Sequence, residues 1–248
     1  MIRRIRNIDR QTAAALVILG TAVVALTIGA IGVLVTVGDD GADLPRQGTI
    51  EEIIEEGPDE PAPAVTADPN LPPPPPPTRV LIPRLYIDAP IIVKGVSNSY
   101  PEVPDRPDQV AWYPPVDAVP NFGAYPGQSS NAVFSGHVDW QTSNGTPIAG
   151  VFYRLREMKI GDLIELVLED GARLQYRVTG NVATPYDDPS VGQVMANTDR
   201  DVITMITCGG SWVSSARSSN GGNYSHRIIV RAERVEALAG DASGGTGG

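Results

Sequence analysis

The hydrophobic residues in the second two-thirds of the chain fall in short runs that are rich in β-branched side chains. Gly, Pro, Asn and Asp separate the runs, and this spacing is typical of a β-barrel or β-sandwich. The pair Asp170-Gly171 between two runs predicts a tight hairpin. We therefore expect an all-β domain over residues 79–236, with strands near residues 79–82, 91–93, 132–135, 163–168, 174–182, 202–207 and 227–235.

Three segments interrupt this β pattern. Residues 150–157 place apolar side chains at helical spacing, and residues 190–196 follow a proline, so both are expected to be short surface helices. Residues 100–128 contain several prolines and aromatic side chains. We expect this stretch to be an irregular connection that packs on the barrel.

An uncharged apolar stretch at residues 13–37 lies close to the N-terminus. It exceeds the roughly 20 residues that a helix needs to cross a membrane. Arginines precede it and aspartates follow it, so the positive-inside rule places residues 1–12 in the cytoplasm and the rest of the chain outside. The alternative is a cleaved secretory signal, but its apolar core usually has only about 7–15 residues. We expect a single-pass anchor in the cell membrane that carries an extracellular domain.

A polar segment at residues 38–78 joins this stretch to the β-rich region. Its many carboxylates account for much of the formal net charge of −10, and it ends in a run of prolines at residues 72–77. Such a composition favours a disordered, partly polyproline spacer, with at most a helical turn or two at residues 50–56. The remaining domain shows no basic footprint for nucleic acid. The glycine-rich residues 237–248 are expected to form a flexible tail.

Cys208 is the one cysteine of the chain. In an exported domain it could be a buried apolar filler, an intermolecular link or a reactive thiol. It ends an apolar run and is followed at once by Gly209 and Gly210. Glycines after a nucleophile permit unusual backbone angles and leave amide groups open to an oxyanion. This placement favours a reactive thiol over a filler or a plain turn.

Thiol chemistry also needs an acid/base and an oxyanion donor. His137 follows an apolar run that ends in Ser-Gly, and Arg227 opens the last β-branched run. A guanidinium is charged at any working pH, although an arginine at a strand start is often only solvated. The second histidine, His226, directly precedes Arg227, whose charge disfavours an imidazolium. His137 is therefore the preferred acid/base.

These segments together resemble the sortase family of cysteine transpeptidases. The resemblance covers about residues 79–235 and is carried by Ser135-Gly-His-Val-Asp, Ile206-Thr-Cys-Gly-Gly and Arg227-Ile-Ile-Val, in the family's order of His, Cys and Arg. It implies a sortase-like eight-stranded β-barrel with short helices, preceded by one transmembrane helix. It also implies that Cys208 is the nucleophile, His137 the acid/base and Arg227 the oxyanion stabiliser.

The resemblance further implies a reaction and its partners. A Leu-Pro-x-Thr-Gly-like sorting signal of a surface protein is cleaved through a thioester at the cysteine. The acyl group then passes to an amine on a peptidoglycan precursor or a pilin lysine, without a cofactor or a metal. The Gly-His-Val-Asp and Thr-Cys-Gly-Gly segments are most similar to class F, and classes D and E share parts of this pattern. Ser211-Trp212 departs from the family's Phe-Asp-like continuation.

Other functions fit the sequence less well. A papain-like cysteine peptidase places Cys before His, and an L,D-transpeptidase needs a Ser-x-Gly-Cys-Arg signature that this sequence lacks. An inert, membrane-tethered β-domain that binds a surface partner stays as the alternative, and thiol reactivity would discriminate it. Asp187, Asp188, Asp199 and Asp201 could bind Ca²⁺, as the corresponding loop does in some sortases, but scattered acidic residues are usually only solvated.

Overall fold

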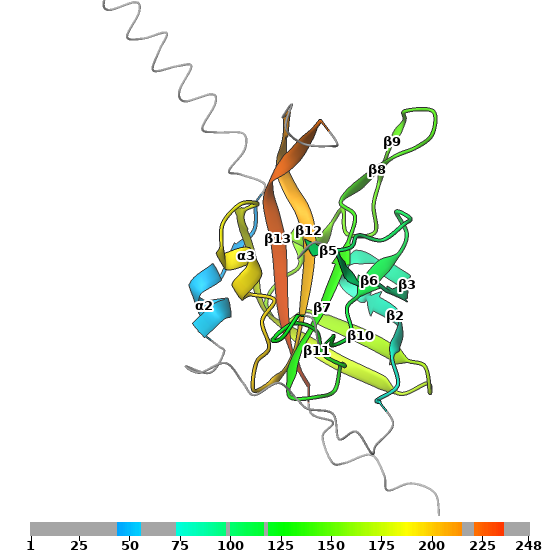
Figure 1. Cartoon of the computed structure of the whole chain (residues 1–248), viewed down its shortest axis with the longest axis vertical. Helices are drawn as coiled ribbons and strands as arrows, with labels where there is room; N and C mark the ends of the chain where they lie inside the picture. Colours follow the sequence, from blue (N-terminus) through cyan, green and yellow to red (C-terminus); the bar gives the residue numbers. More distant parts are fainter. Residues whose placement is uncertain (1–43, 56–72, 98–99, 117–118, 215–220, 236–248) are drawn as a thin grey trace, which may run out of the picture. The chain divides into compact units, whose positions relative to one another are not determined.

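A computed structural model describes residues 44–55, 73–97, 100–116, 119–214 and 221–235 (Figure 1). The expected membrane stretch at residues 13–37 and the tail at residues 237–248 lie outside these residues. Among the residues that are described, no helix has both the length and the apolar character needed to cross a membrane.

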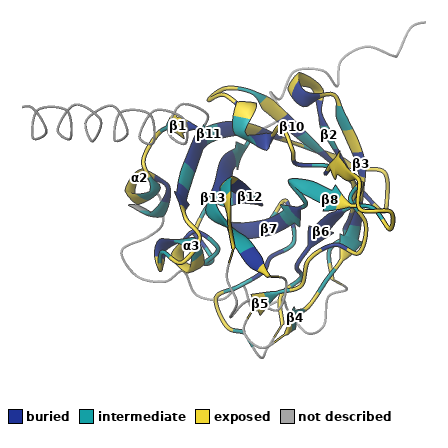
Figure 2. Ribbon diagram, turned by 90° about the horizontal axis from the view of Figure 1, so that it is seen from above, coloured by how far each residue is buried: buried dark blue, intermediate teal, exposed yellow. Residues whose placement is uncertain are grey.

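Eight strands form a closed β-barrel. Seen from above, they follow one another around a ring (Figure 2). Their hydrogen-bonded order is β11-β10-β2-β3-β6-β7-β12-β13, and the pairing of β13 with β11 closes the ring. The pairs β3–β6 and β7–β12 are parallel, and the other neighbours are antiparallel. The strands are β2 (Pro77–Ile82), β3 (Ile87–Val93), β6 (Val110–Trp112), β7 (Ser130–Gly136), β10 (Leu163–Leu168), β11 (Arg173–Pro185), β12 (Asp201–Ser214) and β13 (Gly222–Arg234).

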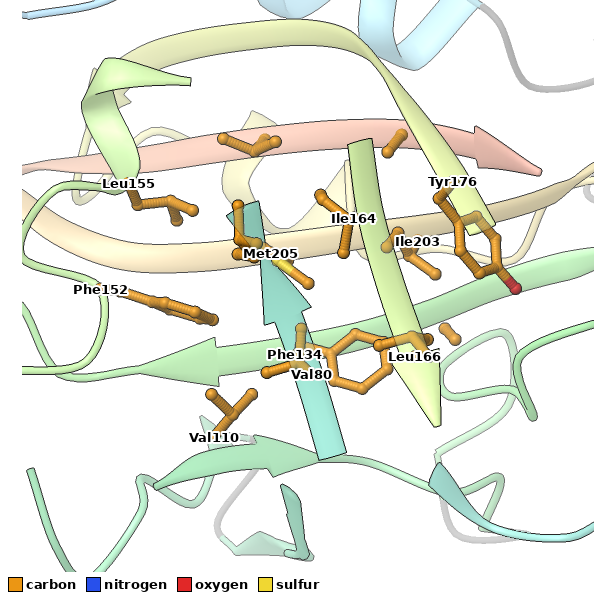
Figure 3. Close-up of a cluster of buried hydrophobic side chains, with 14 of the residues drawn as sticks. Val80, Val110, Phe134, Phe152, Leu155, Ile164, Leu166, Tyr176, Ile203 and Met205 are labelled. Atoms are coloured by element: carbon orange, nitrogen blue, oxygen red, sulfur yellow. The ribbon is translucent and has the colours of Figure 1, made fainter. Parts of the chain in front are cut away.

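The core fills the inside of this barrel. In β10, alternate residues are buried, because successive side chains of a strand point to opposite faces. Side chains from all eight strands meet there with Phe152, Leu155 and Met158 from the segment before β10, and Figure 3 shows part of this cluster. The all-β, eight-stranded barrel expected from the sequence is confirmed. The labelled core residues in the figure are Val80, Val110, Phe134, Phe152, Leu155, Ile164, Leu166, Tyr176, Ile203 and Met205.

One barrel strand lies where an irregular connection was expected. β6 has three residues, and all of them are buried. Its short run therefore shows no alternation of polar and apolar positions that could mark a strand. Trp112 on β6 donates from its indole nitrogen to the Ala124 carbonyl at 2.9 Å. This bond ties the proline-rich stretch to the barrel.

The short helices are present where the sequence predicts them, but they are shorter. The first is the 3₁₀ turn η2 (Leu155–Glu157), and the second is α3 (Ser190–Gln193). Phe152 and Leu155 are completely buried, whereas Tyr153 and Arg154 are exposed, so the first segment packs one face on the barrel and turns the other to solvent. The remaining elements are the 3₁₀ turn η1 (Pro83–Leu85) and the hairpins β4 (Val96–Ser97) with β5 (Tyr100–Pro101) and β8 (Asp139–Gln141) with β9 (Pro147–Ala149).

Residues 44–55 are ordered, whereas the sequence places them in a disordered linker. The strand β1 (Arg46–Gln47) pairs with β11 and continues into the helix α2 (Ile50–Glu55). The Gln47 side chain donates to the Met158 carbonyl at 2.8 Å and accepts from the Ile160 amide at 3.0 Å. The domain that starts at residue 79 in the sequence analysis therefore includes a segment from far upstream.

A capping box begins α2. The Thr49 hydroxyl accepts from the Glu52 amide at 3.1 Å, and the Glu52 carboxylate accepts from the Thr49 amide at 2.7 Å. Ile53 on the same helix is only 3% exposed and belongs to the cluster that contains Val182 and Val194. Burial of this apolar side chain stabilises the docked helix, although the acidic composition of the segment predicts disorder.

The substitution Ile53→Ala tests this docking. We expect it to lower the free energy of unfolding by about 2–4 kcal/mol, because it leaves a cavity between α2 and the barrel. Urea unfolding followed by circular dichroism measures the change. Glu51→Ala, at an exposed position of the same helix, is the control and should change the stability little. Equal effects of the two substitutions would show that the segment does not pack.

Candidate active site

The strand order brings together the three residues predicted to act in catalysis, because His137 directly follows β7 and the other two lie on β12 and β13, the next two strands of the sheet. Cys208 on β12 pairs with Arg227 on β13. On its other side β12 runs parallel to β7, with Ile206 opposite Ser135. The Thr207 hydroxyl donates to the Gly136 carbonyl at 2.8 Å, one residue before His137.

The His137 ring is fixed by two contacts. Its Nε2 lies 2.8 Å from the Pro104 carbonyl, and its ring meets the Trp140 ring edge to face with the centroids 4.9 Å apart. A carbonyl oxygen can only accept, so Nε2 donates to it, and in the neutral ring Nδ1 is then the nitrogen with the lone pair. Among the described residues, no hydrogen bond joins the His137 ring to the Cys208 thiol.

Two glycines let neighbouring segments approach the His137 backbone. A Cβ on Gly150 would lie 2.2 Å from the His137 carbonyl oxygen, and one on Gly136 would lie 2.6 Å from the Phe152 ring. The Phe152 amide donates to the same His137 carbonyl at 2.9 Å. The segment after β9 therefore holds the backbone of His137 in place.

The glycines after Cys208 form a bulge. The register between β12 and β13 shifts between Gly209 and Trp212. Gly210 has a φ of +73°, and a Cβ on Gly209 would lie 2.6 Å from the Ile228 side chain. Bulges of this kind redirect a strand and are frequent beside active sites. The positive φ at Gly210 and the close approach at Gly209 therefore require glycine at both positions.

The Arg227 guanidinium is held along its own strand. It donates to the His226 carbonyl at 3.0 Å and to the Asn223 side chain at 3.1 Å. Its central carbon lies 5.7 Å from the centroid of the Tyr186 ring. The other histidine, His226, has its Nδ1 2.8 Å from the Ser225 hydroxyl and pairs across the strands with Gly209.

A pocket opens beside Cys208. Its lining includes the carboxylate-bearing Asp139, Tyr224 and the glycines after the cysteine, but neither His137 nor Arg227. The Tyr224 hydroxyl donates a short hydrogen bond to the Asp139 carboxylate. Burial of Tyr224 raises the pKa of its hydroxyl, and Asp139 raises it further. No local spacing in the sequence joins Asp139 to Tyr224. The one available signal is that Asp139 lies in the Gly-His-Val-Asp segment, two residues after His137.

Three influences act on the thiol. Burial is the largest and raises the pKa of Cys208, the Arg227 guanidinium lowers that pKa, and the Asp139 carboxylate raises it. The net direction is upward, so the neutral thiol predominates at neutral pH before a substrate enters. Because the thiolate is the nucleophile, a proton has to leave Sγ before or during attack.

Within the described residues, the acidic side chains named above as possible Ca²⁺ ligands do not form a metal site. No group of three or more His, Cys, Asp or Glu side chains gathers there. Asp201 accepts instead from the Tyr176 hydroxyl at 2.9 Å, and Asp188 accepts from the Ser190 amide at 2.9 Å.

The pH dependence of alkylation tests the electrostatics of the thiol. We expect the rate at which iodoacetamide alkylates Cys208 to rise with pH, and the midpoint of this rise to lie at a higher pH than for free cysteine. Asp139→Asn should lower the midpoint because it removes a negative charge, and Arg227→Gln should raise it. Mass spectrometry of the labelled protein across pH gives both profiles. Midpoints that do not move in opposite directions would contradict this arrangement of charges.

A search of curated proteins found no match. Among solved structures, the chain is similar to a lid mutant of Streptococcus agalactiae sortase C1 (20% identity, 65% of this chain and 70% of that chain, TM-score 0.44). It is also similar to a Clostridium perfringens sortase D5 transpeptidase (18%, 64% and 78%, 0.42). Sortase C-1 of Actinomyces oris is a third similar structure (23%, 64% and 72%, 0.43).

The sortase domain family matches residues 80–235. This match spans more than half of the chain and includes His137, Cys208 and Arg227. The chain belongs to the sortase family.

Proposed function

We propose that the chain is a membrane-anchored transpeptidase of the class F type. In this proposal it cleaves a Leu-Pro-x-Thr-Gly-like sorting signal through a thioester at Cys208 and transfers the acyl group to a cell-surface amine. The observation that carries the proposal is the strand order β7-β12-β13, which brings the segments of His137, Cys208 and Arg227 side by side. The Gly136-His-Val-Asp and Thr207-Cys-Gly-Gly segments support the class.

The first half-reaction forms the thioester. The Cys208 thiolate attacks the carbonyl carbon of the threonine in the signal, and negative charge develops on the carbonyl oxygen. The Arg227 guanidinium and a backbone amide at the glycine bulge are the donors available to that oxygen. One such donor is typically worth about 2.7–4 kcal/mol in the transition state.

His137 carries the protons in both half-reactions. With Nε2 donating to Pro104, Nδ1 is the nitrogen that holds the proton for the departing amine. After the thioester has formed, the same nitrogen takes a proton from the incoming amine. The ring has to approach Sγ once a substrate is bound, because it makes no hydrogen bond to the thiol in the described residues.

The proposed location of the reaction at the cell surface rests on the N-terminal part of the chain. The apolar residues 13–37, with arginines before and aspartates after them, support an anchor whose catalytic domain faces outward. An amine on a peptidoglycan precursor or a pilin lysine would then be the acceptor. Both substrates would be proteins or precursors of the cell surface.

A transfer assay tests the proposed chemistry. We expect the detergent-solubilised full chain to join a quenched fluorescent Leu-Pro-x-Thr-Gly peptide to an added amine. Cys208→Ala should abolish the product, His137→Ala should lower the rate about 100-fold or more, and Arg227→Gln should lower it about 100- to 1,000-fold. Mass spectrometry of the joined product measures each rate.

His226→Ala serves as the matched control for the histidine and should keep most of the activity. A larger loss with His226→Ala than with His137→Ala would reverse the assignment of the acid/base. No turnover of any library peptide, together with a Cys208 that resists alkylation, would favour the inert binding domain.

Fractionation of cells tests the proposed location. The full chain should appear in the membrane fraction and be digested by protease added outside the cell, because the anchor leaves the domain exposed there. A chain without residues 1–43 should appear in the soluble fraction. Recovery of the full chain as a shortened soluble protein would instead indicate a cleaved signal.

A further inference from the structure

We propose that Asp139, oriented by Tyr224, binds the ammonium group of the acceptor amine. The inference rests on the proposed function, and it adds a residue that selects the second substrate. Asp139 begins β8, two residues after His137, while Tyr224 lies on β13, three residues before Arg227. Their hydrogen bond joins two hairpins, β8–β9 and β12–β13, which extend from the same end of the barrel (Figure 1).

The carboxylate and the nucleophile share one pocket. Asp139, Tyr224 and Cys208 all contribute to its lining. The Asp139 charge also acts on the Cys208 thiol. A cation that binds to this carboxylate is therefore held within the same pocket as the thioester carbon.

The negative charge of Asp139 has opposite effects on the two half-reactions. A carboxylate beside the thiol disfavours the thiolate, so Asp139 opposes formation of the nucleophile in the first step. In the second step the sulfur is acylated and neutral, and the entering group is an amine that arrives as a cation. The same carboxylate then attracts the substrate. Asp139 is thus suited to acceptor binding and unsuited to activation of the thiol.

Tyr224 leaves the carboxylate able to accept further hydrogen bonds. It occupies one acceptor position on Oδ2, and a carboxylate offers about four such positions. Its raised pKa keeps the hydroxyl protonated, so it remains a donor at neutral pH. The Trp212 ring packs edge to face on the Tyr224 ring with the centroids 5.3 Å apart, which restricts the tyrosine further.

One other charged side chain, Arg156, contributes to the pocket lining. Its guanidinium carbon lies 5.7 Å from the centroid of the Tyr153 ring. Asp139 is the one carboxylate in this lining, and it is the group there that attracts an ammonium group.

The transfer step balances as follows. The bound ammonium gives one proton to His137, and the free amine nitrogen forms a bond to the thioester carbonyl carbon. The C–S bond breaks, and its electron pair returns to Sγ. His137 releases the first proton to solvent, accepts the second proton lost by the nitrogen and passes it to the released sulfur, which restores the thiol and the neutral imidazole and leaves a neutral amide.

Partition of the thioester between water and amines tests this proposal on the full chain in detergent. Glycinamide is the cationic acceptor, and hydroxylamine, uncharged near neutral pH, is the neutral one. For Asp139→Asn we expect the KM for glycinamide to rise about 10-fold. Cleavage of the peptide in water and transfer to hydroxylamine should not fall, because neither needs the carboxylate and its removal favours the thiolate. Added salt should raise the glycinamide KM of the unmodified chain but not that of the variant.

Matched variants exclude a general disturbance of the site. Tyr224→Phe should raise the glycinamide KM by a smaller factor, about threefold, because the carboxylate stays but loses its orienting bond. Asp139→Glu should restore part of the loss. Asp88→Asn removes an equal charge from an exposed ion pair with Arg79 and should leave all the rates unchanged.

The outcomes distinguish this inference from the function on which it rests. An unchanged glycinamide KM in Asp139→Asn, or an equal loss with hydroxylamine, would overturn the acceptor site while transpeptidation stands. Failure of the unmodified chain to form a thioester with any sorting peptide would overturn the proposed function and the acceptor site together.

Discussion

The parallel pairing of β7 with β12 is the constraint on which the candidate site depends. Side chains of a strand alternate between its faces, so a shift of one residue in this pairing would turn Cys208 to the opposite face. The bond from the Thr207 hydroxyl to the Gly136 carbonyl secures the register at the point where β7 ends and His137 begins. The closed ring on either side prevents β12 from sliding, because β13 is in turn paired with β11.

The electrostatics of Cys208 form a compromise between two half-reactions. Burial and Asp139 raise the pKa of the thiol, whereas Arg227 lowers it. A site optimised only for attack would omit the carboxylate. The presence of Asp139 in the pocket lining is therefore accounted for by a step in which the sulfur is already acylated and the second reactant is cationic.

The sequence predicts the parts of this protein whose signals are local. Seven barrel strands contain apolar runs that predict them, and the Asp170-Gly171 turn forms the hairpin between β10 and β11 as expected. The eighth strand, β6, is too short and too fully buried to show alternation. The pair of Asp139 and Tyr224 is joined by the barrel topology across 85 residues of chain, so no local spacing could reveal it. Motif order predicts which residues carry thiol chemistry, but it does not predict how the charges around them are arranged.

Residues 44–55 show how average composition can conceal a docked segment. The acidic, proline-rich surroundings favour disorder, yet the Thr49-x-x-Glu52 capping box and the buried Ile53 are specific enough to order a strand and a helix. Leu44, two residues before β1, reaches the lining of the pocket beside Cys208. The segment therefore belongs to the catalytic domain for two reasons. It buries apolar surface on the barrel, and it completes a wall of the space in which the acyl group is to be transferred.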